Sequence, residues 1–183
     1  ADRKVVLNVG NSLAYKNMEG LIKAFSLVKK ELDDVILVKV GRFTKDQLSL
    51  SLDLDLKLDL DFFERPSLSE DQLVIMYNLA TVTCVPSFKE GFGFPVLESM
   101  ACGTPVVCSN TSSLPEVGGD AALYCDPKDP TDIANKLLRV LRYDDSNRCK
   151  AVEKGFKQAK KFTWEKCAEQ TTQIYRKVFG RVA

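Results

Sequence analysis

The sequence of 183 residues is long enough to bury one hydrophobic core, and its 26 lysines and arginines balance 25 aspartates and glutamates. An even balance gives no overall field that would recruit nucleic acid or an anionic membrane, so any anion-binding site must be local. The chain contains no histidine, which removes the commonest general base and metal ligand; we therefore expect neither a metal site nor a serine–histidine–aspartate triad.

The six cysteines are spread along the chain without a C-x-x-C pair, which predicts free thiols in a reducing cytosol. No apolar run approaches the roughly 20 residues that a membrane-spanning helix needs. The first residues, ADRKVVLNVG, lack the layout of a signal peptide. We therefore expect a cytoplasmic domain. Because a buried-strand pattern begins at Lys4 with almost no lead-in, we expect it to be cut from a larger protein at a domain boundary.

The first part of the chain alternates predicted strands and helices. A short buried strand ends at Gly10, and apolar residues at helical spacing follow over 17–32, with Asn17 as the expected N-cap. A second strand closes at Gly41. This order predicts an α/β fold, a Rossmann-like parallel sheet with helices on both faces.

Residues 48–63 alternate apolar and polar side chains strictly. Such alternation is typical of a half-buried strand, but the stretch is longer than most strands, and an α/β unit needs a helix followed by a strand here. The pattern therefore predicts a third strand near Leu60 to Phe63. For the residues from 48 up to this strand, it does not decide between helix and strand.

The second half of the chain continues the alternation. Ser69 and Gln72 stand in capping-box register before a helix, and the next strand ends at Pro86. Pro95 near the first position and Gly103 past the end define a further helix. The remaining predicted elements are a strand in PVVC, an apolar run in AALYC, a helix from Asp129 and Pro130, and two helical segments, the last from Thr163.

A candidate site lies at the carboxyl ends of the strands. Ligands of open parallel sheets bind where the strand order reverses; in the common order 3-2-1-4-5-6 the first and fourth strands are neighbours there. Lys16 and the turn Gly91–Phe92–Gly93 would then face the same space. Glycines let backbone N–H groups approach an oxyanion, and a helix start near Pro95 adds positive charge. These features favour a phosphate or pyrophosphate with Lys16 as counter-charge, while a simple tight turn also accounts for the glycines.

Two carboxylates accompany this turn. Glu98, in the first turn of the following helix, is either a partner of the helix dipole or an acceptor for vicinal hydroxyls such as those of ribose. Glu90 is either a solvated loop charge or an acceptor and charge stabiliser at a sugar. Because carboxylates repel phosphate unless they meet hydroxyls, the pair suggests a ligand with both phosphates and diols. The sequence lacks a P-loop and a G-x-G-x-x-G turn after the first strand, which argues against Walker-type and nicotinamide chemistry.

Three stretches, GNSLAYKNMEGLIKAF, PSFKEGFGFPVLESMACGTPVVCSNTSSLPEV and KKFTWEKCAEQTTQIYRKVF, resemble the C-terminal nucleotide-sugar domain of the retaining glycosyltransferases of family 4, which have the GT-B fold. The resemblance covers nearly the whole chain except roughly residues 44 to 66. It implies that residues 1–183 are the donor-binding half of an enzyme whose N-terminal acceptor domain is absent from this chain. Alone, the chain would bind nucleotide sugar weakly and transfer nothing.

The resemblance also implies roles for single positions. Glu90 and Lys16 would be the catalytic residues, Glu90 near the donor sugar and Lys16 neutralising the diphosphate as it leaves. Glu98 would hold the ribose hydroxyls. The positions that would wrap the sugar and diphosphate through backbone groups are Gly91, Phe92, Gly93 and Phe94. Transfer with retention would need no metal and no cofactor beyond the nucleoside-diphosphate sugar, the donor substrate.

Two positions depart from the pattern of the family. Many relatives carry arginine directly after the glycine that ends the first strand, here Gly10, whereas this chain has Asn11, which we retain only as a loop position of the donor site. Lys16 would therefore neutralise the diphosphate without this second cation. The loop after the third strand usually contains a glycine near the base, and this chain has Arg65 and the two residues after it there, which we expect to touch the base.

The segments YKNMEGLIKAF and SNTSSLPEV are similar to those of mannosyltransferases and related enzymes of surface-polysaccharide assembly. This implies a hexose donor, with GDP-mannose favoured, and a glycan or lipid-linked acceptor bound through the missing domain. No nucleic-acid partner is expected. A peripheral position of the full-length protein on the cytoplasmic face of a membrane is compatible with this role. The alternatives are a nucleotide-sugar epimerase of the same fold and a stand-alone nucleotide-binding module without catalysis.

Overall fold

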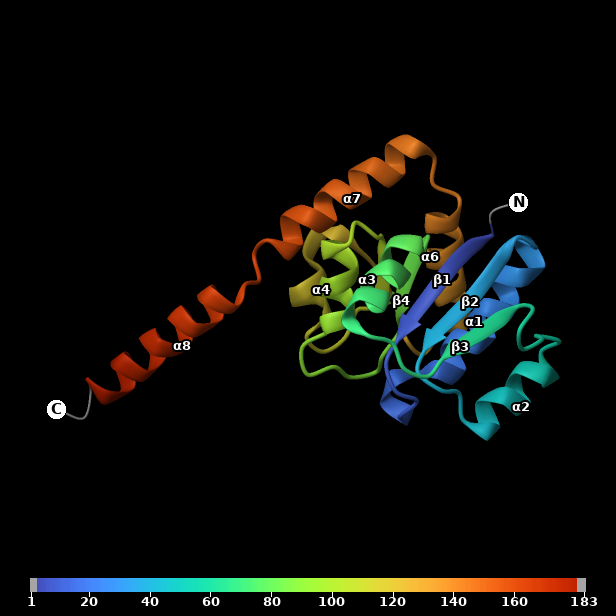
Figure 1. The fold of residues 1–183 in the computed structure, drawn as a ribbon, viewed down its shortest axis with the longest axis horizontal. Helices are drawn as coiled ribbons and strands as arrows, with labels where there is room; N and C mark the ends of the chain where they lie inside the picture. The colour runs from blue at the N-terminus through green and yellow to red at the C-terminus, as the bar shows by residue number, and fades with distance from the viewer. Residues whose placement is uncertain (1–2, 181–183) are drawn as a thin grey trace.

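Six strands form one sheet in the computed structural model, which describes residues 3–180 (Figure 1). The strands are β1 (Lys4–Val9), β2 (Val35–Val40), β3 (Phe62–Arg65), β4 (Val82–Val85), β5 (Val106–Ser109) and β6 (Ala122–Cys125). They lie side by side in the order β3-β2-β1-β4-β5-β6, and every pairing between them is parallel. The predicted order and fold class are confirmed; residues 1, 2 and 181–183 of the predicted domain range lie outside the described residues.

Helices cover both faces of the sheet (Figure 1). They are α1 (Met18–Glu31), α2 (Lys45–Asp53), α3 (Glu70–Leu79), α4 (Phe94–Ala101), α5 (Leu114–Gly118), α6 (Pro130–Leu141), α7 (Asp145–Ala159) and α8 (Trp164–Phe179), with short 3₁₀ turns η1 (Ala14–Lys16) and η2 (Gly119–Ala121). The capping box of Ser69 and Gln72 forms as predicted, and Pro95 lies in the first turn of α4. Gly103 follows α4 with φ +76°, as a helix-ending glycine should.

Asn17 is the N-cap residue of α1, as predicted, but its side chain makes no capping hydrogen bond. Asn17 adopts the left-handed conformation, φ 56°, which asparagine tolerates better than most residues. Its Nδ2 instead donates to the carbonyl oxygens of Pro86, at 3.0 Å, and Pro127, at 2.7 Å. The residue thereby joins the chain after β1 to the segments that follow β4 and β6.

The alternating stretch over 48–63 is mostly helix and turn. The helix α2 begins at a capping box in which Thr44 Oγ1 accepts from the N–H of Gln47, a local signal stronger than the alternation. Leucines spaced by two cannot share one face of a helix, so Leu52 is 68% exposed. The third strand begins at Phe62, at the end of the predicted range rather than at its start.

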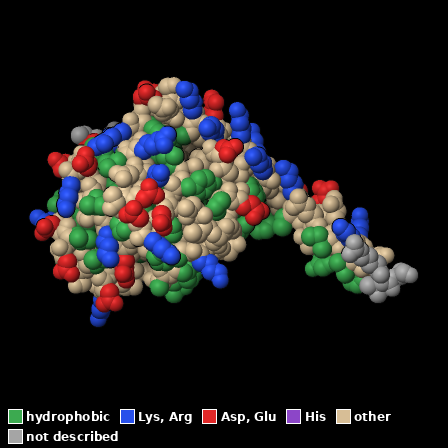
Figure 2. Space-filling model, turned by 180° about the vertical axis from the view of Figure 1, so that it is seen from behind, with side chains coloured by type: hydrophobic (Ala, Val, Ile, Leu, Met, Phe, Trp, Pro, Cys, Tyr) green, Lys and Arg blue, Asp and Glu red, His purple; other side chains and the backbone are tan. Residues whose placement is uncertain are grey.

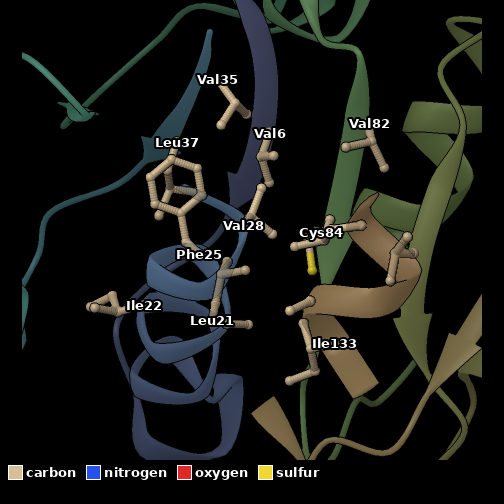
Figure 3. Close-up of a cluster of buried hydrophobic side chains, with 14 of the residues drawn as sticks. Val6, Leu21, Ile22, Phe25, Val28, Val35, Leu37, Val82, Cys84 and Ile133 are labelled. Atoms are coloured by element: carbon tan, nitrogen blue, oxygen red, sulfur yellow. The ribbon is translucent and has the colours of Figure 1, made fainter. Parts of the chain in front are cut away.

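The larger core lies between the sheet and helices α1 and α6 (Figure 3). Inward residues of β1, β2 and β4 pack there on α1, as Val6, Leu37 and Cys84 show against Phe25. Each large apolar side chain buried in this way contributes roughly 1.5–3 kcal/mol. All six cysteines are free thiols, as predicted, and burial raises the pKa of the Cys84 thiol well above its ordinary value.

The last helix, α8, extends away from the rest of the molecule (Figure 1). Green apolar side chains lie along this arm in Figure 2. Trp164, the first residue of α8, is 76% exposed. Within residues 3–180, no helix combines the length and the hydropathy that crossing a bilayer would require.

Candidate functional site

An ion pair links the chain after β1 to the loop after β4. Lys16 Nζ lies 2.8 Å from Oε1 and 3.0 Å from Oε2 of Glu90, although 74 positions separate the two residues. Their side chains are 18% and 8% exposed, so the pair is largely shielded from water. Because β1 and β4 are neighbours in the sheet, their carboxyl ends bring Lys16 and the loop after β4 into the same space, as predicted, and the contact with Glu90 is what the structure adds.

The loop after β4 is held by hydroxyl groups. Ser87 Oγ donates to Glu90 Oε1 at 2.7 Å and orients the carboxylate. From the chain after β5, Ser112 Oγ donates to the carbonyl of Glu90 at 2.5 Å and Ser113 Oγ donates to the carbonyl of Phe92 at 2.7 Å. No role for these serines was predicted from the sequence, although the run SNTSS before α5 marks a hydroxyl-rich loop.

Free backbone donors follow this anchored stretch. The structure provides no acceptor within residues 3–180 for the N–H groups of Gly91, Phe92, Gly93 and Phe94. Gly93 has φ +109°, and a Cβ there would lie 2.7 Å from Leu114 Cδ2, so only glycine fits without a shift. Because these N–H groups precede α4 and open its first turn, they form a site suited to an oxyanion.

Glu98 lies in the second turn of α4 rather than in the first, because the helix starts at Phe94 and its first turn contains no acidic residue. Of the two alternatives for Glu98, an interaction with the helix dipole at the N-terminus of α4 is therefore wrong. Its Oε2 accepts a hydrogen bond from Tyr77 Oη at 2.7 Å. Burial first, and Glu98 second, raise the pKa of Tyr77, so this hydroxyl stays protonated and donates. Tyr77 was not predicted as a site residue, since only the contact between α3 and α4 reveals it.

The side chains of Phe92 and Phe94 face the arm formed by α8. Their ring centroids are 4.8 Å apart, the Phe92 ring is 5.8 Å from that of Phe162, and the Phe94 ring is 6.3 Å from that of Trp164. Together with Ile174 they line a cleft of about 590 Å³. Phe92 and Phe94 therefore contribute backbone groups to the site near Lys16 and Glu90, while their side chains line the cleft beside α8.

The remaining predicted positions lie along the same edge of the sheet. Gly10 follows β1 with φ +143°, and Asn11 is exposed, with Oδ1 accepting from the N–H of Leu13 at 3.3 Å. Arg65 ends β3, two strands away from β1, and its Nη1 donates to the carbonyl of Glu64 at 2.9 Å. No hydrogen bond of the described residues joins Arg65 to Lys16 or to the loop after β4.

A match to known proteins agrees with this geometry. The model of the family described as glycosyl transferases group 1 matches residues 1–158. The chain belongs to this family. The O-antigen chain mannosyltransferase B of Escherichia coli is 37% identical over 185 aligned positions, which cover 93% of this chain and 45% of that protein. The chain therefore spans less than half the length of this relative.

Solved glycosyltransferases of the GT-B fold share the architecture. The sucrose-phosphate synthase of Thermosynechococcus elongatus superposes with a TM-score of 0.84 at 27% identity, over 98% of this chain and 46% of that chain. The C-terminal domain of a glycosyl transferase group 1 family protein, LpcC, from Francisella tularensis superposes with a TM-score of 0.72 at 23% identity, over 86% of this chain and 85% of that chain. The latter shows that a domain of this fold crystallises by itself.

The part of the chain that matches the glycosyl transferases group 1 model contains every predicted site residue and stops before α8. Within the described range 3–180, no three acidic or cysteine side chains are grouped so that they could hold a metal ion.

Proposed function

We propose that this chain is the donor-binding domain of a retaining glycosyltransferase and that it binds a nucleoside-diphosphate sugar. The observation that carries the proposal is the Lys16–Glu90 ion pair, which lies where the strand order reverses. The free N–H groups of residues 91–94 follow Glu90 directly, so a cation, a carboxylate and neutral donors come together. A ligand that combines phosphates with hydroxyls matches this combination.

The diphosphate would lie on Lys16 and the free N–H groups of residues 91–94. During transfer, the bond between the anomeric carbon of the sugar and the phosphate oxygen breaks, and the bonding electrons stay on the departing diphosphate. Donors that are already oriented stabilise this charge without reorganisation, which is commonly a large contribution to catalysis. Lys16 would therefore act on the leaving group rather than on the sugar.

The two carboxylates would accept hydrogen bonds from hydroxyl groups of the donor. Glu98 would accept from the ribose, with its orientation held by Tyr77. Glu90 already makes a close contact with Lys16, so a diphosphate has to share this cation with it. Repulsion between Glu90 and phosphate is offset if the carboxylate accepts from hydroxyls of the transferred sugar. Arg65 would contact the base from the end of β3.

The favoured donor is GDP-mannose, and the favoured acceptor is a glycan or a lipid-linked glycan. The name and the 37% identity of the Escherichia coli relative support mannose transfer. The acceptor would bind to a second domain in the full-length protein, which would work in the cytoplasm or peripherally on a membrane. An epimerase of the same fold would bind the same class of donor, so a transfer assay with the full-length protein distinguishes the two.

Calorimetric titration of this chain with GDP, GDP-mannose, UDP and UDP-glucose tests the proposal. Replacing Lys16 with alanine should weaken the binding of the preferred nucleotide about tenfold or more, because a charge-assisted hydrogen bond contributes roughly 1.5–3 kcal/mol. Lys150→Ala removes the same charge from an exposed position on α7 and serves as the control. Equal affinities of the Lys16 variant, the control and the wild-type protein would overturn the proposal.

A further inference from the structure

Lys39 is a fully buried lysine, 0% exposed, near the carboxyl end of β2. Lysine is almost never fully buried unless it is paired, because desolvating the ammonium is costly. Within residues 3–180, Lys39 forms no salt bridge. The nucleotide-binding roles proposed above do not use it, so its position requires another explanation.

The ammonium of Lys39 lies beneath the loop that follows β1. Nζ lies 3.0 Å from the carbonyl oxygen of Gly10, 3.4 Å from that of Asn11 and 3.4 Å from Asn8 Oδ1. These three acceptors match the three protons of an ammonium, and all of them are neutral. The charge is therefore hydrogen-bonded but not neutralised.

This contact determines where the loop directs its N–H groups. The described residues contain no cis peptide bond, and in a trans peptide unit the C=O and the N–H point in opposite directions. Drawing the carbonyls of Gly10 and Asn11 toward Lys39 therefore turns the N–H groups of Asn11 and Ser12 away from it. In the described part of the chain neither N–H has an acceptor, so both are available to an anion.

A second ammonium lies on the other side of the same loop. A Cβ placed on Gly10 would be 3.9 Å from Lys16 Nζ, and the carbonyl of Gly10 receives the hydrogen bond of Lys39. Two positive charges thus flank one glycine, and the carboxylate that pairs with Lys16 is Glu90. On the side of β3, Glu64 adds a negative charge, but its Oε2 accepts from the N–H of Phe43 at 3.0 Å.

We propose that Lys39 is a positioning residue of the donor site, which holds the N–H groups of Asn11 and Ser12 toward the diphosphate and takes up a proton when the diphosphate binds. The inference rests on the proposed function, since it assumes that a nucleoside diphosphate occupies this end of the sheet. It gives the site a second positive charge from below the loop, although Asn11 itself is uncharged.

The direction of proton movement follows from the charges around Lys39. Burial, followed by the charge of Lys16, lowers the pKa of Lys39 to about 8, and Glu64 opposes this shift. Near pH 8 about half of the molecules therefore lack this proton. A diphosphate at the loop adds negative charge, which raises the pKa of Lys39 again. Binding at pH 8 should thus take up about half a proton, and the affinity should fall as the pH rises above 8.

Calorimetry of this 183-residue chain with GDP, and with UDP as a second probe, measures the uptake directly. At pH 8, titrations in Tris and in bicine differ in the heat of buffer ionisation, and the dependence of the observed heat on it gives the number of protons bound. The phosphates of the probe are already ionised at pH 8 and contribute none, because their last pKa is about 6. We expect about half a proton for the wild-type protein and close to none for Lys39→Met.

The pH profile provides a second readout that a purely structural role would not change. We assume that bound diphosphate restores the ordinary pKa of Lys39. The GDP affinity of the wild-type protein should then fall about fivefold more between pH 8 and pH 9 than the GDP affinity of Lys39→Met does. Lys150→Met, on the exposed surface of α7, should behave as the wild-type protein does. Circular dichroism shows whether Lys39→Met is folded; if it is not, the wild-type proton count decides alone.

The outcomes separate this inference from the proposed function. Binding of GDP or UDP without proton uptake, or with equal uptake by folded Lys39→Met, overturns the role of Lys39 and leaves the proposed function standing. Failure of the wild-type protein to bind either probe overturns both. Uptake of about half a proton that disappears in Lys39→Met supports the inference.

Discussion

Two loops meet where the strand order reverses, and they are held in different ways. The loop after β1, residues 10–12, lies on the buried ammonium of Lys39, whereas the loop after β4, residues 87–94, is fixed by neutral hydroxyls of Ser112 and Ser113. Each loop contains backbone N–H groups that have no acceptor within residues 3–180. If both loops bind the diphosphate as proposed above, one half of the site rests on a buried charge and the other on neutral hydroxyls, and the first half should be the one that responds to pH.

The two solutions also differ in energy. A buried charge without a carboxylate partner destabilises the fold, because desolvation disfavours the charged form. A hydroxyl that donates to a carbonyl contributes roughly 0.5–1.5 kcal/mol and is indifferent to pH. The stability of the loop after β1, and the contribution of this loop to binding, should therefore change with pH, whereas those of the loop after β4 should not.

The largest effect is expected for Lys39→Met as the pH is raised. In the unfolded chain Lys39 keeps its ordinary pKa of 10.5, and in the native protein the pKa is about 8 because of burial and Lys16. Between these values the unfolded state holds a proton that the native state has released, so a rise in pH stabilises the native wild-type protein. The variant lacks this contribution. Relative to the variant, the wild-type protein should gain about 3 kcal/mol in free energy of unfolding from pH 7 to pH 10.5.

Urea unfolding of both proteins across this range measures that gain. Cysteine and tyrosine ionisation is common to the two proteins and cancels in the difference between them. A difference that stays constant with pH would mean that Lys39 has no depressed pKa.

The hydroxyl-anchored loop should respond to the double substitution Ser112→Ala and Ser113→Ala. Losing the two donors frees the carbonyls of Glu90 and Phe92, and we expect GDP affinity to fall by up to about thirtyfold, since two hydrogen bonds of roughly 1 kcal/mol each are lost. The loss should be the same at pH 7 and pH 9 in calorimetry. Ser146→Ala, at an exposed position of α7, is the control. A loss that grows with pH would contradict the distinction between the loops.

A smaller effect is expected at the Tyr77–Glu98 hydrogen bond. Without the donor in Tyr77→Phe, the Glu98 carboxylate is less well oriented, and Glu98→Gln weakens it as an acceptor. Each change should reduce the preference for GDP over its 2′,3′-dideoxy analogue about fivefold, which corresponds to about 1 kcal/mol. Competition binding with the two nucleotides provides the measurement. An unchanged ratio in both variants would remove Glu98 from the ribose site.

The smallest effect, and one of opposite sign, is expected for Glu90→Gln. The amide keeps the shape of the side chain but removes the charge that competes for Lys16, so GDP should bind a few-fold more tightly. The full-length enzyme carrying this change should lose transfer activity if Glu90 acts at the sugar. Weaker GDP binding would indicate that Glu90 holds Lys16 in place for the ligand.

Much of this arrangement could be predicted from the sequence. Alternating strands and helices imply a parallel sheet, and its usual strand order places Lys16 beside the loop after β4; the 2.8 Å contact of Lys16 with Glu90 of that loop is a detail that only the structure shows. The helix over 45–53 could not be predicted from its leucine spacing, because the Thr44 capping box decides locally against the alternation. Tyr77 and Lys39 were beyond sequence reasoning, since their roles arise only from packing against α4 and the loop after β1.

The central claim is that backbone N–H groups of both loops bind one diphosphate. Amide NMR spectra of the ¹⁵N-labelled chain during titration with GDP test it most directly. We predict that the largest shifts occur at Asn11, Ser12 and the N–H groups of residues 91–94, which have no acceptor in the described structure. Shifts confined to the cleft beside α8, at Trp164 and Ile174, or no shifts with either GDP or UDP, would contradict the account.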